Sequence, residues 1–470
     1  ENAIEPSWPL ADEVIEQGRV GPGEMLAIDT YTGKIWYSDQ IDHDLKERHP
    51  YADWLSEHIR HLVPFEQCDT GLVGTRLFDD DLQKVYHKLF NYSYEEINSV
   101  IAVLATKGIE ATGSMGDDTP MAVMSTQTRN IYDYFRQLFS QVTNPPIDSL
   151  RESHVMSLAT CIGREQNPFA ETSGYADRVV FDSPVLMYSD LKQLREFDPE
   201  FYKAETFSLN YDPKENGIKT AIKNLCESVI QAVRDNNVVI VILTDRKISP
   251  DNLVIPAPLA LGAVQQTLVN AQLRCDANIV VETAGVRDSH QLAVLIGLGA
   301  TAVYPYLAYE TVEQLVEQKH IEIETKLALI NYRQGLNKGL LKIMSKMGIS
   351  TVASYRCSNL FEVIGLSDSI MTLCFPNLIS RIQGAEFKDL ELELIEQAKF
   401  AWNARKPMRH GGQLKYMSGG EYHAYNPDVV TLLQKAIRSE QYSDYTNYAN
   451  QVNHRQPSSL RDLLRLDIQP

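Results

Sequence analysis

The chain has 470 residues, of which 44% are hydrophobic and 23% charged, a composition typical of a soluble globular protein with several domains. Its net charge of −18 argues against nucleic acid or an anionic membrane surface as a partner, because both attract basic proteins. The longest strongly apolar run, 238–243, is too short to cross a membrane, and the first 20 residues lack the apolar core of a signal peptide. The six cysteines are widely spaced, which disfavours a zinc or iron–sulfur site and indicates a reducing compartment.

Three regions follow one another along the chain. Residues 1–40 contain a hairpin signal, with strand-like segments at 25–28 and 34–37 on either side of a turn. Residues 41–400 begin with helical signals and continue as an α/β region. Residues 401–470 are polar and typical of a connector, with one helical stretch predicted near 428–438.

Local signals set the first helices of the central region. Asp79–Asp81 and the capping box Ser93-x-x-Glu96 predict helix starts, and Gly108 predicts a helix end. The connector carries the densest basic patch, Arg405, Lys406, Arg409, His410 and Lys415. A solvated linker is the simplest interpretation of this patch.

The run from Gly113 to Asp148 is the most informative part of the chain. It contains two polar loops rich in glycine and proline, with apolar residues between them at helical spacing, which predicts a helix over 129–142. Asp118 or Thr119 could cap an earlier helix with Pro120 at its first position. Ser149-x-x-Glu152 predicts the start of the next helix. From these residues alone, two capped helix connections explain the run.

Farther along, strands and helices alternate. Helices are predicted over 218–235, near 259–272 and over 289–298, and the strands are 238–243, 278–282 and 302–304. Continuous apolar strands are typical of a parallel sheet that is buried on both faces. The order therefore predicts an α/β fold, a parallel sheet covered by helices and preceded by a helical segment.

Candidate reactive groups are few. Glu57-His58-x-x-His61 could place two imidazoles on adjoining helix turns, but no third ligand with suitable spacing is near, and an exposed helix face is the favoured interpretation. Asp117 and Asp118 could bind a cation, although helix capping explains them more simply. His154, Asp182 and Ser183 lack an identifiable triad partner. The sequence thus points to no catalytic residue and no metal site.

Long motifs in the chain resemble the large subunit of glutamate synthase. They are Gly-Ser-Met-Gly-Asp-Asp-Thr-Pro at 113–120 and Val-Thr-Asn-Pro-Pro-Ile-Asp at 142–148, with 18–25 upstream resembling the end of that family's glutaminase domain and 419–428 downstream resembling the approach to its flavin domain. Among the family's types, the chain looks most similar to the ferredoxin-dependent one. The resemblance implies a glutaminase tail at 1–40, the central domain at 41–400 and a connector toward the FMN domain at 401–470. The chain shows neither an N-terminal cysteine nucleophile nor the family's clustered iron–sulfur cysteines.

A second resemblance concerns Thr283–Arg287 and Leu298–Ala300, which are similar to the phosphate-gripping end of flavin-dependent (β/α)8 barrels. The glycine expected after the last strand is replaced by Tyr304-Pro305-Tyr306, which removes an N–H group and adds bulk. The resemblance therefore implies a degenerate barrel-like sheet with Gly285 and Arg287 in a vestigial phosphate site. No cofactor is expected in this chain, although its parent resembles enzymes that contain FMN and an iron–sulfur cluster.

In the family, ammonia passes from the glutaminase site to the flavin site, and the central domain contributes wall to this tunnel. Carried onto this chain, the expected wall residues are Thr112, Gly113, Ser114, Met115, Thr143, Asn144, Pro145 and Pro146. A wall for neutral ammonia should expose no free carboxylate, so Asp117, Asp118 and Asp148 should face away or be paired.

The expected partners are therefore the glutaminase and FMN domains of the same polypeptide, with ferredoxin as a possible partner of the parent alone. The expected location is the cytoplasm, or the plastid stroma for a plant-type parent. Two alternatives stay open: a free-standing barrel enzyme acting on a phosphorylated metabolite, and a module that docks a partner through residues 405–415.

Overall fold

The computed structural model describes residues 14–68, 78–113, 116–138, 147–167 and 169–464. The chain divides into two units: an N-terminal unit of residues 1–59 with 171–177, and a main unit of residues 60–170 with 178–470. Within the described ranges, no helix is both long enough and apolar enough to span a bilayer.

The N-terminal unit contains the predicted hairpin. Strands β1 (Leu26–Ile28) and β2 (Ile35–Tyr37) pair antiparallel, with Leu26 opposite Tyr37. Helices α1 (Ser38–Glu47) and α2 (Tyr51–His58) follow, and the hydroxyl of Tyr51 donates to Glu171 at 2.8 Å. This hydrogen bond joins the unit's two chain segments.

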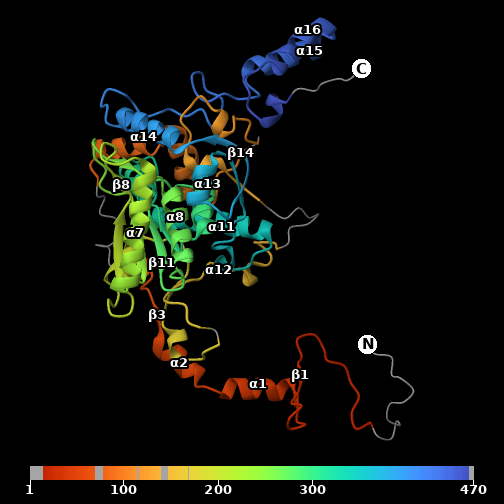
Figure 1. Ribbon diagram of the computed structural model, residues 1–470. Coiled ribbons are helices and arrows are strands. Elements are labelled where there is room, and N and C mark those ends of the chain that lie inside the picture. The colour runs from red at the N-terminus through yellow and green to blue at the C-terminus, as the bar shows by residue number, and fades with distance from the viewer. Residues whose placement is uncertain (1–13, 69–77, 114–115, 139–146, 168, 465–470) are drawn as a thin grey trace. The chain divides into compact units, whose positions relative to one another are not determined.

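The centre of the main unit is a four-stranded parallel sheet in the order β12-β11-β9-β7 (Figure 1). Its strands are β7 (Ala204–Ser208), β9 (Ile240–Thr244), β11 (Asn278–Glu282) and β12 (Ala302–Tyr304). Every residue of β9, β11 and β12 is buried, which explains their continuous apolar sequences. The strand order follows the chain order, as in (β/α) barrels, but the described strands form an open sheet.

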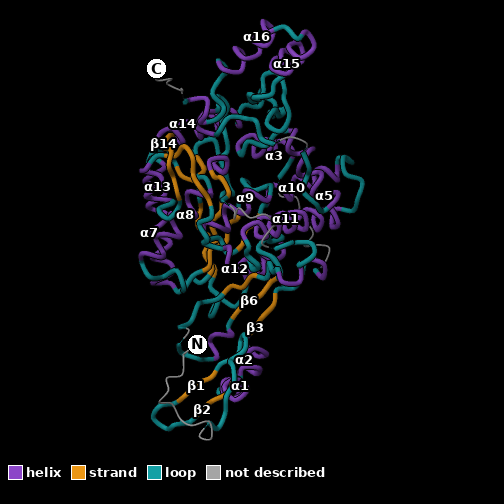
Figure 2. The backbone as a smooth tube through the Cα atoms, turned by 90° about the vertical axis from the view of Figure 1, so that its right-hand side faces the viewer, coloured by secondary structure: helices purple, strands orange, loops and turns teal. Residues whose placement is uncertain are grey.

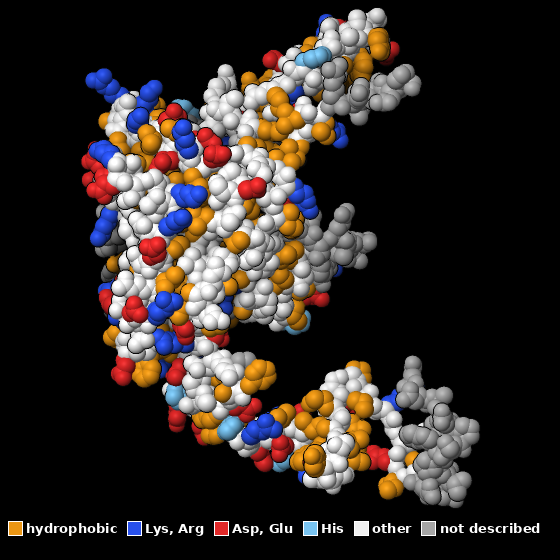
Figure 3. Space-filling model, viewed as in Figure 1, with side chains coloured by type: hydrophobic (Ala, Val, Ile, Leu, Met, Phe, Trp, Pro, Cys, Tyr) orange, Lys and Arg blue, Asp and Glu red, His pale blue; other side chains and the backbone are white. Residues whose placement is uncertain are grey.

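Helices connect these strands and cover the sheet (Figures 1 and 2). The connecting helices are α7 (Ile218–Asn236), α8 (Ala257–Asn270) and α9 (Ser289–Leu298), and α10 (Tyr306–Glu317) and α11 (Thr325–Met347) follow β12. The N-cap Asp288 accepts from the backbone N–H of Gln291, and α9 ends at Leu298, before Gly299, so the helix predicted over 289–298 is confirmed. Basic and acidic side chains are intermixed over α7 on the face drawn in Figure 3.

Smaller elements complete the two units. The remaining helices and strands are β3 (Ile59–His61), α3 (Asp80–Leu89), α4 (Tyr94–Glu96), α5 (Ala102–Lys107), β4 (Phe135–Gln137), β5 (Thr160–Ile162), β6 (Arg178–Phe181), α6 (Tyr188–Glu196), β8 (Asn210–Tyr211), β10 (Leu253–Val254), α12 (Val352–Tyr355), β13 (Phe361–Leu366), α13 (Asp368–Cys374), β14 (Ile379–Ala385), α14 (Phe387–Ala401), α15 (Pro427–Ser439) and α16 (Tyr442–Asn453). Short 3-10 turns lie at Phe65–Gln67, Ala122–Met124, Ile131–Tyr134, Ser153–Val155, Ser173–Ala176 and Leu460–Leu463, and a π-helical turn at Ile97–Ile101.

The helix predicted over 129–142 is wrong. A 3-10 turn at Ile131–Tyr134 leads into strand β4, which pairs antiparallel with β13, Phe135 lying opposite Val363. Phe135 is fully buried, and the centres of its ring and the ring of Phe375 lie 5.1 Å apart. Pairing with a strand more than 200 residues away outweighs the local helical spacing. Residues 139–142 lie outside the described residues.

Two predicted helix starts are also wrong. No α-helix begins at Asp118 or Thr119, because the Asp118 carboxylate is engaged by His423 and by the backbone N–H of Tyr425. After Ser149 there is only a short 3-10 turn, since the carboxylate of Glu152 instead accepts from the backbone N–H of Asp148. In both places a competing hydrogen bond takes the group that was expected to cap a helix.

The connector is more structured than its composition suggests. The predicted helix near 428–438 is confirmed as α15, which Asn426 caps through the N–H groups of Asp428 and Val429. Helix α16, which the sequence did not indicate, packs against α15.

Candidate functional site

A cavity of about 470 Å³ with many polar side chains in its lining lies in the main unit; we call it the polar cavity. Thr112 and Gly113 line it and are exposed, so the cavity reaches the surface at these two expected wall residues. Of the other expected wall residues, Ser114, Met115 and Thr143–Pro146 lie outside the described residues. The described part of the expected wall therefore lies at the polar cavity.

Several chain segments far apart in sequence line this cavity, among them residues of 117–119 and 129–133 and the three segments that follow. The first follows α5, which ends at Gly108 in the left-handed conformation (φ 61°) and releases the loop that carries Thr112. The second is the turn from β11 to the N-terminus of α9. The third is the return loop 413–415, from the connector. The π-helical turn Ile97–Ile101 adds Ser99 and Val100 to the lining.

The return loop is held by a single carboxylate. Glu95 accepts from the backbone N–H groups of four consecutive residues, Gly412, Gln413, Leu414 and Lys415, at 2.8, 2.9, 3.1 and 2.9 Å. A run of N–H groups turned toward one point forms an anion-binding nest. Here the bound anion is the carboxylate of Glu95, and these hydrogen bonds hold the connector against the helical segment that contains Glu95.

Five carboxylates line the polar cavity: Glu96, Asp117, Asp118, Asp133 and Asp288. The strongest pairing is that of Glu96 with Arg287, whose Nε and Nη2 donate to one carboxylate oxygen at 2.8 and 2.6 Å. Arg287 also donates to the carbonyls of Phe90 and Asn91. Its guanidinium carbon lies 4.4 Å from the centre of the Tyr92 ring, on which it stacks. Burial by itself would lower the pKa of the Arg287 guanidinium, but the charge and hydrogen bond of Glu96, together with Tyr92 and Asp288, outweigh it, and the net pKa is raised.

Asp118 and Asp117 are paired as well. The carboxylate of Asp118 lies 2.7 Å from Nδ1 of the buried His423, and Nε2 of His423 lies 3.1 Å from the carbonyl of Gly412. Both ring nitrogens of His423 therefore lie within hydrogen-bonding distance of an oxygen atom, one from Asp118 and one from Gly412. Asp117 accepts from the hydroxyl and the N–H of Thr119 at 2.6 and 3.0 Å.

The remaining two carboxylates are held by an arginine and by a helix. Asp133 accepts from Nε of Arg129 at 2.9 Å, and Nη1 of Arg129 donates to the buried Glu421 at 3.1 Å. Burial would lower the pKa of Arg129, but Asp133 and Glu421 together raise it. Asp288 caps α9. Each of the five lining carboxylates thus has its own partner within the described part of the chain.

At the predicted vestigial phosphate site, groups of the chain itself occupy several backbone N–H donors. The N–H of Gly285 donates to the Thr283 hydroxyl at 3.0 Å, and that of Ala284 donates to the Asp245 carboxylate. The N–H of Arg287 donates to the side chain of Gln291 at 2.8 Å, and the guanidinium donates to Glu96. The N–H groups of Ala284, Gly285 and Arg287 are therefore not free to bind a phosphate.

Tyr304 and Tyr306, which stand at the end of the last strand in place of the expected glycine, are both buried. The hydroxyl of Tyr306 donates to Asp245 at 2.7 Å, and its ring packs under the guanidinium of Arg246 at 4.0 Å. The two tyrosines therefore fill space beside the turn at Gly285.

The other candidate groups have structural surroundings. His58 ends α2 and lies 2.8 Å from Asp177, whereas His61 lies beyond the helix end, so the two imidazoles do not share a helix face. No group of three or more potential metal-ligating side chains occurs within the ranges the structure covers. In the basic patch, Arg409 donates to Asn91 at 2.7 Å and to Gln397 at 3.3 Å, while Arg405 is exposed.

Sequence reasoning missed several residues of the polar cavity. Arg129, Glu421 and His423 pair with residues 4 to 305 positions away, and the return loop was assigned to a solvated linker. The motif at 419–428 contained Glu421 and His423, but it served only to recognise the family. The available signal was the presence of Glu421 and His423 inside this motif, since such groups require partners when the fold buries them.

The fold and the site define an α/β domain with a polar cavity whose charges are internally paired. The sequence profile described as "Glutamate synthase central domain" matches residues 85–367, and that of "Glutamine amidotransferases class-II" matches residues 8–54. The chain belongs to the glutamate synthase central domain family.

Relatives in that family are large chains of glutamate synthases. The chain is 36% identical over 460 residues to "Glutamate synthase [NADPH] large chain" of Azospirillum brasilense, covering 97% of this chain and 30% of that one. It is 35% identical over 469 residues to "Ferredoxin-dependent glutamate synthase 1, chloroplastic/mitochondrial" of Arabidopsis thaliana, covering 96% and 28%. The two identities do not distinguish the NADPH type from the ferredoxin type. The chain spans less than a third of the length of these relatives.

Similarity to solved structures is weak. A mutant flavocytochrome b2 with pyruvate bound aligns at 16% identity and a TM-score of 0.27, covering 38% of this chain and 40% of that one. This likeness supports no conclusion about the fold.

Proposed function

We propose that this chain is the non-catalytic central domain of a glutamate synthase, and that its polar cavity contributes wall to the path of ammonia between a glutaminase and an FMN domain of the same polypeptide. In this proposal the chain carries no cofactor of its own. An electron donor such as ferredoxin would interact with other parts of the parent protein.

One observation carries the proposal: the five carboxylates that line the polar cavity are all paired. Ammonia is a nucleophile only while it is unprotonated, and a free carboxylate would stabilise the ammonium ion and retain it. Carboxylates that already accept hydrogen bonds from arginine, histidine, a hydroxyl or a helix N-terminus attract a passing cation less than free carboxylates do. The expected wall residues Ser114, Met115 and Thr143–Pro146 remain part of the proposal on sequence grounds.

The same contacts weigh against the alternatives. A free-standing barrel enzyme for a phosphorylated metabolite needs N–H donors near Gly285, and these donors are already used. The second alternative is docking of a partner through the basic patch. Arg409 contributes little to such docking, because its guanidinium donates hydrogen bonds to Asn91 and Gln397.

The proposal is tested in the full-length synthase with Gly113→Phe, which places a bulky side chain at the rim of the polar cavity. We expect glutamine hydrolysis to continue, the glutamate formed per glutamine hydrolysed to fall several-fold, and free ammonia to appear in solution. Glutamate formation from added ammonium salt should be retained, because the second active site is untouched.

The matched control is Lys107→Phe, which adds the same bulk at an exposed position of α5 that does not line the cavity. Its coupling ratio should equal that of the wild type. A normal coupling ratio in Gly113→Phe would count against the proposal, and equal losses in both variants would show a general structural effect instead.

A further inference from the structure

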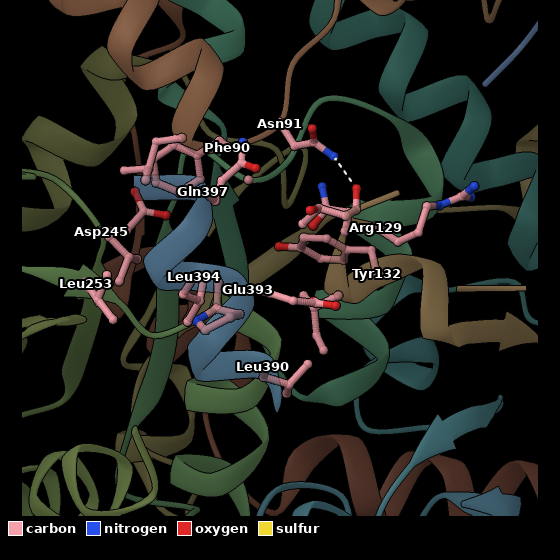
Figure 4. A pocket seen from close by; sticks show the side chains of 18 of the residues that line it. Phe90, Asn91, Arg129, Tyr132, Asp245, Leu253, Leu390, Glu393, Leu394 and Gln397 are labelled. Atoms are coloured by element: carbon pink, nitrogen blue, oxygen red, sulfur yellow. Dashed lines mark hydrogen bonds between the residues drawn. The ribbon is translucent and has the colours of Figure 1, made fainter. Parts of the chain in front are cut away.

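A second cavity of about 110 Å³ lies in the main unit at the carboxyl ends of β9 and β11; we call it the apolar cavity (Figure 4). Much of its lining is hydrophobic: Leu89, Phe90, Ile131, Leu253, Leu390 and Leu394. Open parallel sheets bind ligands at the carboxyl ends of their strands, because loops and helix ends converge there. An apolar cavity of about 150 Å³ holds benzene, so this one has room for about four to six non-hydrogen atoms.

One polar group in the apolar cavity has no partner. The hydroxyl of Tyr132 is buried, the residue being only 2% exposed, and makes no hydrogen bond within the described part of the chain. A Cβ atom placed on Gly285 would lie 3.5 Å from this hydroxyl, and Figure 4 shows the hydroxyl directed into the space between Tyr132 and Asp245. Burial raises the pKa of Tyr132 well above its usual value, so the hydroxyl stays neutral and can both donate and accept.

Two carboxyl groups give the apolar cavity a negative character. Asp245 is 1% exposed and is held by hydrogen bonds from Thr283, Ala284 and Tyr306, with no ion pair to an arginine or lysine in the resolved contacts. Glu393 of α14 is half-buried at the lining, and it too has no hydrogen-bond or ion-pair partner in the resolved contacts.

The nearby basic group does not offset these charges. Arg129 lines the apolar cavity, but its guanidinium pairs with Asp133 and Glu421. Around Glu393, burial and the carboxylates of Asp389 and Glu396 raise the pKa of the carboxyl. The described lining residues therefore include no unpaired basic side chain, and they include the hydroxyl of Tyr132, which has no hydrogen-bond partner.

We propose that the apolar cavity is a binding site for a compact primary ammonium ion with a short alkyl body of three or four carbons. The ammonium group donates to the Tyr132 hydroxyl and to the Glu393 carboxylate, while the alkyl part contacts the leucine side chains. The cationic head offsets the excess of negative charge, and the apolar body displaces water from the hydrophobic wall. This site is separate from the polar cavity and does not depend on the proposed passage of ammonia.

The test measures binding of n-butylammonium chloride to the full chain by saturation-transfer NMR and isothermal titration calorimetry. Three other probes separate the contributions of charge and of the alkyl body: 1-butanol is neutral, butyrate is anionic, and ammonium chloride lacks the alkyl group. We expect n-butylammonium to bind at least about tenfold more tightly than each of the three, the difference expected for one ion pair or one buried alkyl group. Absence of n-butylammonium binding, or equal binding of 1-butanol, would overturn the proposal.

Two isosteric variants locate the site. Tyr132→Phe and Glu393→Gln should each weaken n-butylammonium binding at least about fivefold, because each removes one hydrogen-bonding partner of the ammonium group. Glu396→Gln is the matched control, since it removes the same charge from an exposed position of α14 that does not line the cavity. Equal weakening in the Glu393 and Glu396 variants would show a diffuse charge effect and refute the site. Glu393→Gln alone decides the matter if Tyr132→Phe does not fold.

Discussion

Removing the guanidinium of Arg287 should destabilise the main unit more than any surface ion-pair change. Arg287→Met keeps an unbranched side chain of similar length but leaves Glu96 with only the N–H and hydroxyl of Ser93 as hydrogen-bond partners. It also removes the donors to the carbonyls of Phe90 and Asn91. The side chains of Arg287 and Glu96 are only 4% and 15% exposed, so water replaces the lost contacts poorly.

The size of the effect follows from these contacts. Two hydrogen bonds to a charged carboxylate are lost, each worth about 1.5–3 kcal/mol. Breaking a buried ion pair by removing one partner costs about 3–5 kcal/mol, because the other charge stays buried without compensation. We therefore expect Arg287→Met to lower the free energy of unfolding by about 3–5 kcal/mol. In a Glu96→Gln background the same change should cost at least about 2 kcal/mol less, since no buried charge is then left behind.

Equilibrium urea unfolding, followed by far-ultraviolet circular dichroism, provides the four free energies of this double-mutant cycle. Lys214→Met is the control, because the Lys214–Asp251 pair is about three-quarters exposed on both sides, with 74% and 75% of the two side chains accessible. It should cost less than about 1 kcal/mol. A loss below 1 kcal/mol for Arg287→Met, or equal losses in the two backgrounds, would refute the assignment of Glu96 and Arg287 as a buried coupled pair.

Two further outcomes are expected. Burial raises the pKa of Asp245 to about 6 from 3.8, so the folded chain retains a proton that the unfolded chain releases between these values. The free energy of unfolding should therefore fall by up to about 3 kcal/mol as the pH rises from 4 to 6. Asp245→Asn should lack this decrease in urea unfolding, and parallel pH profiles would contradict the expectation. Glu95→Ala should greatly accelerate amide hydrogen exchange at 412–415 while leaving α9 unchanged, because four N–H groups lose their acceptor; unchanged exchange at 412–415 would show that other contacts hold the return loop.

The sequence by itself determined those elements whose signals are local. The predicted strands 238–243 and 278–282, the helix predicted over 218–235 and the helix end at Gly108 all correspond to elements of the structure. Each depends on neighbours within a few positions along the chain: a cap needs the next turn, and a doubly buried strand needs only its own apolar side chains. The family could likewise be recognised from contiguous motifs.

The tertiary structure decided what depends on distant partners. Phe135 lies in a strand, although its spacing indicated a helix, because β13 supplies backbone hydrogen bonds and a buried aromatic neighbour. The pairing of Asp118 with His423 could not be inferred locally either, since 305 residues separate them. Whether a carboxylate is free or neutralised depends on which groups folding brings within about 3 Å, and only the folded chain determines that distance.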